Sequence, residues 1–276
     1  MGTSAPGDEF TAPHFGSSAL LVIDAQVDFL DGGASPVAGT SDRLPAMRRL
    51  VEAYRSAGRP VVHVVRLYDG DDVDLVRRAA VRSGARIVRP GSAGARIAAP
   101  LLPHPDVELD SDVLLAGGLQ RVGRDEVVVW KPRWSAFHRT PLDDHLRAVG
   151  VDTVVVAGCN FPNCPRATVF DASERDYRVV VAEDATSQVT PERLADAVAL
   201  GVCALPTEAV VRNVATALGT RRRPATSAGS GVPTIAHGTP SSPQEAAAEP
   251  GPTDEFRRTG RSARTYAIEP PTGDPA

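Results

Sequence analysis

Apolar residues occur along this chain in two alternating patterns. In one, Val, Ile, Leu and Ala fill several consecutive positions, which is typical of strands buried on both faces of a sheet. In the other, apolar residues recur every three or four positions, which is typical of amphipathic helices. The continuous runs predict strands at residues 19–23, 61–65, 127–130, 153–157, 178–182 and 202–205.

Helical spacing fills the segments between these strands. It predicts helices at residues 41–57, 73–81, 140–150, 164–175, 190–201 and 207–218. Two of them begin with an N-cap followed by Pro, at Thr140-Pro141 and Thr190-Pro191. A strand, helix, strand order needs a crossover that makes the two strands parallel. The sequence therefore predicts an α/β fold with three layers, α/β/α, around a mainly parallel sheet of five to six strands.

Composition changes at both ends of this pattern. Residues 1–17 are rich in Gly, Ser, Thr and Pro and lack the regions of a signal peptide, so we expect a flexible N-terminal arm. Residues 18–219 contain the predicted strands and helices and are expected to form one domain, in which residues 68–120 form loops around the site. Residues 220–276 contain few large apolar side chains and much Pro, Gly, Ser and Ala, which predicts a disordered tail.

The overall composition narrows the class of partner. The chain has 276 residues, of which 42% are hydrophobic, and a formal net charge of -4. Nucleic acids and anionic membrane surfaces select clustered Lys and Arg, so we expect neither as a partner, and no apolar run is long enough to cross a bilayer. Three cysteines without a CxxC pair argue against a disulfide framework and favour a reducing, cytoplasmic compartment.

Reactive side chains follow three of the predicted strands. Asp24 ends the first apolar run, Lys131 follows the run at 127–130, and Cys164 begins the helix after 153–157. Because the carboxyl ends of parallel strands meet at one edge of a sheet, we expect these side chains to converge. Each also has an ordinary interpretation: Asp24 as a cap, Lys131 as a solvated residue and Cys164 as a small buried side chain.

Together the three groups would make a nucleophilic site. A helix N-terminus and a nearby ammonium favour a thiolate, so we expect Lys131 to lower the pKa of Cys164 from about 8.5 to near neutrality. Asp24 can accept a proton and return it. Free backbone N–H groups at the helix start can stabilise an oxyanion. The combination predicts acyl transfer through a covalent intermediate.

Three segments resemble the isochorismatase-like cysteine hydrolases, which include nicotinamidases and N-carbamoylsarcosine amidase. They are Leu20 to Phe29, then Lys131 to Phe137 with Thr140 and Leu142, and Gly158 to Cys164 followed by Thr168, Asp171 and Ala172. The resemblance covers residues 18–218 and implies a Rossmann-like topology and a catalytic triad of Asp24, Lys131 and Cys164. It also implies a cis peptide bond between Cys159 and Asn160 that helps to form the oxyanion hole, and assembly into homodimers or homotetramers.

The chain departs from the family pattern around the nucleophile. Asn160-Phe161-Pro162-Asn163 precedes Cys164, and Pro165-Arg166 follows it. We therefore expect a pocket with its own shape, walled by aromatic side chains, in which one Arg is a partner for an anionic substrate. The residues assigned to these roles are Phe29, Trp134, Phe137, Phe161 and Arg166, each with simple packing as the alternative.

No catalytic metal or other cofactor is expected. The Asp and His motif that the resembling nicotinamidases carry after the second strand is absent from Arg66 to Asp72, which makes nicotinamide a less favoured substrate. His63 lies inside an apolar run without other ligands at metal-binding spacing, so we interpret it as a core histidine.

The leading hypothesis is a hydrolase that cleaves a C–N bond of a small molecule, in an amide, a carbamoyl group or a lactam. Cys164 would attack the carbonyl, Asp24 would protonate the leaving amine, and water would resolve a thioester acyl-enzyme. Two alternatives stay open. One is an isochorismatase-type vinyl ether hydrolase, which in the family does not need the Cys, and the other is a catalytically silent binding or scaffold protein.

Overall fold

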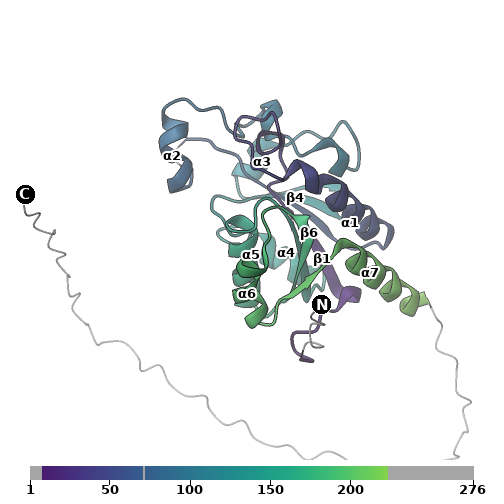
Figure 1. The fold of residues 1–276 in the computed structure, drawn as a ribbon. Coiled ribbons are helices and arrows are strands. Elements are labelled where there is room, and N and C mark those ends of the chain that lie inside the picture. Colours follow the sequence, from purple (N-terminus) through teal and green to yellow (C-terminus); the bar gives the residue numbers. More distant parts are fainter. Residues whose placement is uncertain (1–7, 71, 223–276) are drawn as a thin grey trace, which may run out of the picture. The chain divides into compact units, whose positions relative to one another are not determined.

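The computed structural model describes residues 8–70 and 72–222 (Figure 1). The strands are β1 (Ser18–Ile23), β2 (Val61–Val65), β3 (Leu119–Gly123), β4 (Glu126–Trp130), β5 (Thr153–Gly158), β6 (Arg178–Thr186) and β7 (Cys203–Leu205). The α-helices are α1 (Leu44–Ser56), α2 (Leu75–Arg82), α3 (Ser111–Leu115), α4 (Leu142–Ala148), α5 (Cys164–Ser173), α6 (Pro191–Ala199) and α7 (Thr207–Arg222).

The strands of the described residues form one seven-stranded sheet in the order β3-β4-β2-β1-β5-β6-β7. Every neighbouring pair is parallel except β3 and β4, which are antiparallel. The predicted α/β class and mainly parallel sheet are confirmed, but the sheet has one strand more than predicted. The extra strand is β3, whose residues are only partly buried because it lies at the edge, so it lacks a continuous apolar run.

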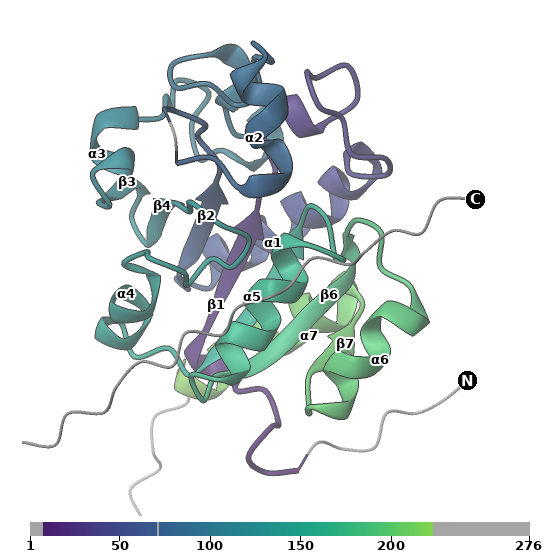
Figure 2. The same cartoon turned by 90° about the vertical axis from the view of Figure 1, so that its left-hand side faces the viewer.

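Helices cover both faces of the sheet, which gives the predicted three layers (Figure 2). All residues of β1 are buried, and they point alternately to the two faces. Leu20 and Val22 belong to the core that contains residues of α1 and α7. Leu21 and Ile23 belong to the core that contains residues of α4, α5 and α6. This two-sided burial explains why the β1 sequence is apolar at each position.

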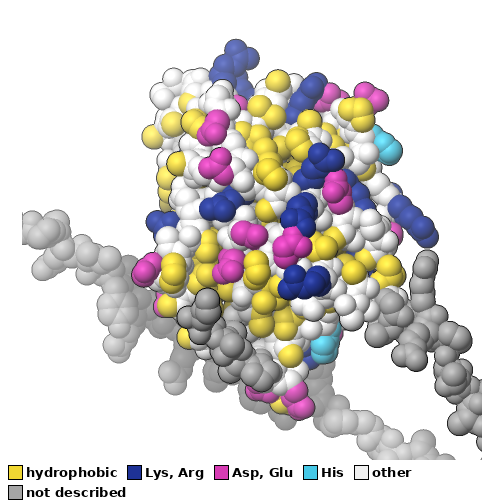
Figure 3. Space-filling model, turned by 45° about the vertical axis from the view of Figure 1, so that its right-hand side comes forward, with side chains coloured by type: hydrophobic (Ala, Val, Ile, Leu, Met, Phe, Trp, Pro, Cys, Tyr) yellow, Lys and Arg dark blue, Asp and Glu magenta, His cyan; other side chains and the backbone are white. Residues whose placement is uncertain are grey.

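The surface carries charges of both signs. On the face of the described residues that Figure 3 shows, Lys and Arg side chains are interspersed with Asp and Glu and do not gather into a patch of one sign. Within the same described residues, no helix combines the length and the apolar character that crossing a membrane requires.

Both ends of the predicted domain differ slightly in extent from the sequence-based boundaries. Within the predicted N-terminal arm, the backbone N–H of His14 donates to Thr153 Oγ1 at 3.0 Å, and its ring Nδ1 lies 2.7 Å from Asp152 Oδ2. Helix α7 continues past residue 219 to Arg222. Residues 1–7 of the arm predicted for 1–17, and residues 223–276 of the tail predicted for 220–276, lie outside the described residues.

Strands β1 and β5 approach each other closely at Gly158. The φ of Gly158 is +121°, and a Cβ atom there would lie 2.1 Å from the carbonyl oxygen of Ile23. The N–H of Cys159 donates to that same oxygen at 2.8 Å. A residue without a side chain is therefore required where the chain leaves β5 toward Cys164.

We expect Gly158→Ala to lower the free energy of unfolding by about 3 kcal/mol or more, because a clash with backbone adds to an unfavourable φ. The control is Gly150→Ala, where φ is +71° and nothing lies within 4 Å of the added Cβ. That change is expected to cost about 1–2 kcal/mol. Urea unfolding measures both. Equal losses would show that the close approach to Ile23 is not a constraint.

Candidate active site

Three adjacent parallel strands end at the same edge of the sheet with a charged residue each. Lys131 follows β4, Arg66 follows β2 and Asp24 follows β1, and these strands are neighbours in the order β4-β2-β1. The backbone N–H of Asp24 donates to Val64, and that of Lys131 donates to Val65, so β2 holds both neighbours in register. The convergence predicted from the strand ends is present.

Lys131 and Asp24 form a buried ion pair. Lys131 Nζ donates to Asp24 Oδ2 at 2.8 Å, and the exposed fractions of the two side chains are 0% and 5%. The second carboxylate oxygen, Asp24 Oδ1, is also buried but has no hydrogen-bond partner among the described residues. Asp24 also lines a pocket, so the unused acceptor belongs to a residue of the pocket wall.

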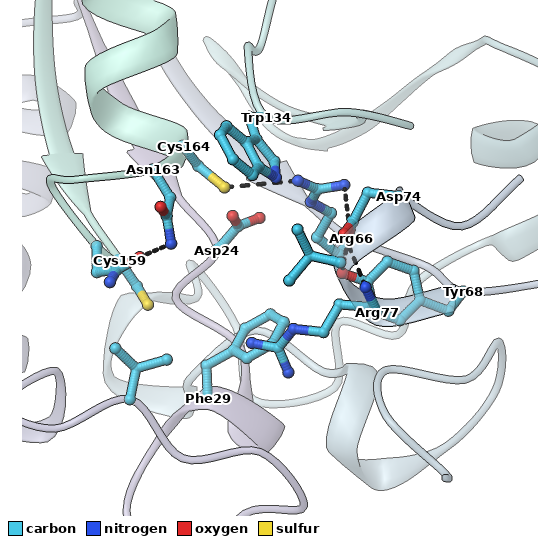
Figure 4. A pocket seen from close by; sticks show the side chains of 13 residues that line it. Asp24, Phe29, Arg66, Tyr68, Asp74, Arg77, Trp134, Cys159, Asn163 and Cys164 are labelled. Atoms are coloured by element: carbon cyan, nitrogen blue, oxygen red, sulfur yellow. Dashed lines mark hydrogen bonds and ion pairs between the residues drawn. The ribbon is translucent and has the colours of Figure 1, made fainter. Parts of the chain in front are cut away.

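Cys164 is the first residue of α5 and lines the same pocket (Figure 4). Thr168 fixes this start of the helix, because its Oγ1 donates to the Cys164 carbonyl at 2.8 Å and accepts from the Ala136 N–H at 3.0 Å. The helix is thereby tied to the loop that follows Lys131.

The turn between β5 and α5 contains two unused donors. The backbone N–H groups of Asn160 and Cys164 make no hydrogen bond to another described residue. The Cys159–Asn160 peptide bond is cis, as expected from the family resemblance. Cys159 and Asn160 both line the pocket with Cys164. The donors therefore lie in the segment that carries the thiol.

A second buried cation lies beside the thiol, and sequence reasoning missed it. Arg66 is 2% exposed. Its Nη2 lies 3.6 Å from Cys164 Sγ, while its Nη1 donates at 3.2 Å to both Asp74 Oδ2 and the Pro132 carbonyl (Figure 4). The signal that could have identified Arg66 is its position directly after a continuous apolar strand, which is the criterion that selected Asp24 and Lys131.

Asp74 connects Arg66 with helix α2. Its Oδ1 accepts from the backbone N–H of Arg77 at 3.2 Å and so caps the helix. Its Oδ2 accepts from Arg66 and, at 2.7 Å, from the Tyr68 hydroxyl. The site therefore contains two carboxylate and cation pairs, Asp24 with Lys131 and Asp74 with Arg66.

The predicted substrate-binding residues divide into two groups. Phe29 and Trp134 line the pocket, whereas Phe137, Phe161 and Arg166 are not among its lining residues. Phe137 and Phe161 are buried in the core formed with α4, α5 and α6, and Phe137 stacks on Tyr177. Arg166 lies on the outer side of α5, where it pairs with Asp196 at 3.0 Å. Of the three, only Arg166 lies on α5, where the rotation of successive residues around the helix turns its side chain away from the pocket.

Comparison with known proteins assigns this arrangement to a family. A protein-family model with the description "Isochorismatase domain" matches residues 18–212, which is more than half of the chain. The chain belongs to the isochorismatase family. The resemblance inferred from the three sequence segments is therefore confirmed.

Individual members of the isochorismatase family are clearly similar to this chain. A protein of Arabidopsis thaliana named probable inactive nicotinamidase is 39% identical over 186 residues, which cover 66% of this chain and 86% of that protein. A ureidoacrylate amidohydrolase of Methylobacterium radiotolerans is 31% identical over 196 residues, with coverages of 63% and 69%. The crystal structure of an isochorismatase family protein from Desulfovibrio vulgaris is 35% identical, covers 72% of this chain and 98% of its own, and has a TM-score of 0.61.

The described residues of this member of the isochorismatase family contain no cluster of side chains suited to bind a metal ion. Among residues 8–70 and 72–222, no group of three or more His, Cys, Asp or Glu side chains could hold a metal ion. His63 is buried in β2, and its Nε2 lies 2.6 Å from Glu126 Oε1. The histidine is thus a core residue, as interpreted from the sequence.

Burial dominates the electrostatics of the Cys164 thiol. It raises the pKa of Cys164 above the ordinary value, and the Asp24 carboxylate raises it further, while Lys131 and Arg66 act in the opposite direction. The expectation of a pKa near neutrality is therefore wrong, because the sequence reveals the neighbouring cation but not the depth of burial. The thiol keeps its proton near neutral pH, and its attack on a carbonyl requires a base.

We expect the rate of Cys164 alkylation by iodoacetamide to rise with pH through an inflection above the ordinary cysteine value of about 8.5. Arg66→Gln removes a cation that lowers this pKa, so it should move the inflection upward and slow alkylation at pH 8 several-fold. Arg66→Lys, which keeps the charge, is the control. Because Cys159 and Cys164 lie on one tryptic peptide, fragmentation of that peptide in the mass spectrometer is needed to assign the label to Cys164 rather than to Cys159, whose pKa burial raises to about 12.

This expectation has two contrary outcomes. An inflection below the ordinary cysteine value in the wild-type protein would show that the cations outweigh burial. An unchanged profile in Arg66→Gln, with the fold verified by circular dichroism, would show that Arg66 has no influence on the thiol.

Proposed function

We propose that this protein is a hydrolase that cleaves a C–N bond of a small molecule, in an amide, a carbamoyl group or a lactam. The observation that carries the proposal is the buried Asp24–Lys131 ion pair beside Cys164 at one pocket, with Asp24 Oδ1 unpaired. A carboxylate, an ammonium and a thiol in this arrangement suit nucleophilic acyl transfer. The amidohydrolase named among the relatives supports the same reaction class.

The first half-reaction forms a thioester. Cys164 Sγ attacks the carbonyl carbon while its proton moves to Asp24 Oδ1. The C–N bond then breaks, and Asp24 returns the proton to the leaving nitrogen, which departs as ammonia or an amine. Lys131 Nζ stays hydrogen-bonded to Asp24 Oδ2, so the unpaired Oδ1 is the oxygen that acts as a base toward a thiol of raised pKa.

The oxyanion of the tetrahedral intermediate needs hydrogen-bond donors. We assign this role to the backbone N–H groups of Asn160 and Cys164, which have no partner among the described residues. The N-terminus of α5 adds a favourable dipole at the same position. Donors of this kind stabilise the charge that develops on the carbonyl oxygen.

The second half-reaction restores the enzyme. A water molecule attacks the thioester carbonyl while Asp24 accepts one of its protons. The C–S bond breaks, the acid product is released, and the proton passes from Asp24 to the Cys164 sulfur. The same carboxylate therefore serves as base and acid in both halves.

One relative carries a name that bears on activity. The Arabidopsis protein is named a probable inactive nicotinamidase, which describes that protein. This chain contains Asp24, Lys131 and Cys164. Lys131 donates a hydrogen bond to Asp24, and Cys164 lines the same pocket as Asp24. This supports a competent site over a catalytically silent one.

We expect Cys164→Ala to reduce ammonia release from amide and carbamoyl compounds by about a thousandfold or more, because it removes the proposed nucleophile and burial raises the pKa of the other pocket thiol, Cys159, to about 12. Cys203→Ala is the control, since Cys203 lies in β7 at a distance from the pocket. A panel of such compounds identifies a substrate for the wild type, and mass spectrometry of quenched reactions detects an acyl adduct on Cys164.

The outcomes also separate the alternative functions. Wild-type rates of C–N hydrolysis in Cys164→Ala would contradict the mechanism. Hydrolysis of a vinyl ether that survives Cys164→Ala would favour the isochorismatase-type reaction. No turnover in the panel, together with no selective reaction of Cys164 with electrophiles, would favour a binding or scaffold role.

We also propose that the protein acts in the cytoplasm, on a small molecule, as a homodimer or homotetramer. The assembly is supported by the family resemblance, and the compartment by the free thiols of Cys159, Cys164 and Cys203. Light scattering in solution and cell fractionation test the two statements.

A further inference from the structure

The pocket contains one cation that has no carboxylate partner among the described residues. Four charged side chains line it: Asp24, Arg66, Asp74 and Arg77. Asp24 is paired with Lys131, and Asp74 is paired with Arg66. Since these two pairs are neutral together, the charge of Arg77 is the excess on the pocket wall.

Arg77 lies on α2 and reaches over the pocket toward Phe29. Its guanidinium carbon lies 5.8 Å from the centroid of the Phe29 ring, and its Nη1 donates to Ser35 Oγ. In Figure 4 its guanidinium lies beside Phe29, on the opposite side of the pocket from the Cys164 sulfur. The cation is thus positioned by two walls of the pocket, α2 and the loop around Ser35.

The two pocket arginines differ in the donors that they leave free. Arg66 uses Nη1 for Asp74 and the Pro132 carbonyl, and its Nη2 faces the Cys164 sulfur. In Arg77, Nε and Nη2 have no hydrogen-bond partner among the described residues. A half-buried guanidinium with free donors fits the planar, paired acceptors of a carboxylate.

We propose that Arg77 binds a carboxylate of the substrate while the scissile carbonyl lies at Cys164. The inference rests on the proposed C–N hydrolysis and narrows its substrates to amides or carbamoyl compounds that carry an anionic group at the end remote from the scissile bond. Phe29 and Trp134 flank the intervening part of the molecule. Arg77 therefore takes the role that the sequence suggested for Arg166.

Electrostatics favour this orientation over the reverse. A carboxylate placed near the thiol would approach the unpaired Oδ1 of Asp24, and like charges in a buried site repel strongly. At Arg77 the same group meets an uncompensated cation. The charges of the pocket therefore favour one orientation of the substrate, in which the neutral carbonyl lies at Asp24 and Cys164 and the anionic group lies at Arg77.

The test uses two alkylating reagents of nearly equal size, N-iodoacetylglycine and its neutral amide, N-iodoacetylglycinamide. The Cys164 sulfur attacks the CH2–I carbon of either reagent, an S–C bond replaces the C–I bond, iodide leaves and the thiol proton passes to buffer. We expect the acid to react with Cys164 about tenfold or more faster than the amide, relative to the same ratio for 2-mercaptoethanol, because a charge-assisted pair forms at Arg77.

Variants assign the preference to one residue. Arg77→Gln should abolish the preference for the acid, and Arg77→Lys, which keeps the charge but loses the planar fork, should keep part of it. Arg78→Gln is the matched control: it removes the same charge from the same helix, but Arg78 donates to the Val73 carbonyl and does not line the pocket. The preference should persist in that variant.

Two outcomes of the alkylation test would overturn the inference. One is a wild-type reagent ratio equal to that of 2-mercaptoethanol, and the other is a preference for the acid that persists in Arg77→Gln. The measurement needs no hydrolysis, so it is separate from the proposed function. If the wild-type protein releases no ammonia from any compound but still reacts faster with the acid reagent than with the amide reagent, the hydrolase function is rejected and the anion site is retained. Efficient hydrolysis of neutral amides, unchanged by Arg77→Gln, would reject the anion site and retain the hydrolase.

Discussion

A fully buried ammonium group fixes the arrangement of this molecule at the edge of its sheet. Lys131 has no access to water, so its charge requires an acceptor, and Asp24 supplies it. The two residues are carried by strands that are not neighbours, because β2 lies between β4 and β1. The ion pair therefore spans the end of β2 and holds only when three strands keep their register. Breaking such a pair typically costs about 3–5 kcal/mol.

The same pair decides what the thiol can do. Burial keeps the proton on Cys164, and the unpaired oxygen of Asp24 is available to remove it. The lysine occupies the other oxygen of that carboxylate and so fixes its orientation toward the pocket. In the proposed mechanism, the thiol therefore loses its proton only as it attacks the carbonyl, and no thiolate is present beforehand.

Strand ends carried most of the predictive information in the sequence. Continuous apolar runs identified the central strands, and the residues after them, Asp24 and Lys131, did converge. Arg66 also directly follows an apolar strand, but it was not selected, because the segment after it shows no regular sequence pattern. Arg77 could not be predicted, because no local pattern says that α2 folds over the pocket. The presence of an aromatic residue near the nucleophile did not predict that its side chain lines the pocket. Phe161 is fully buried in the core, because the geometry of the turn, and not the residue type, sets where a side chain points.

The edge strand β3 escaped prediction for a related reason. Its residues are partly exposed and pair antiparallel with only one neighbour, so burial imposes no continuous apolar pattern on them. Sequence patterns report how thoroughly an element is buried. They are informative for the centre of this sheet and weak at its exposed edge, where β3 lies.

Asp74 couples two parts of the pocket mechanically. One of its oxygens caps the helix that carries Arg77, and the other holds the guanidinium beside Cys164. A change at this one position therefore loosens both the start of α2 and the cation beside the thiol. An exchange of α2 for another helix would likewise remove the anchor of Arg66 unless the new helix also began with an acid at the position of Asp74.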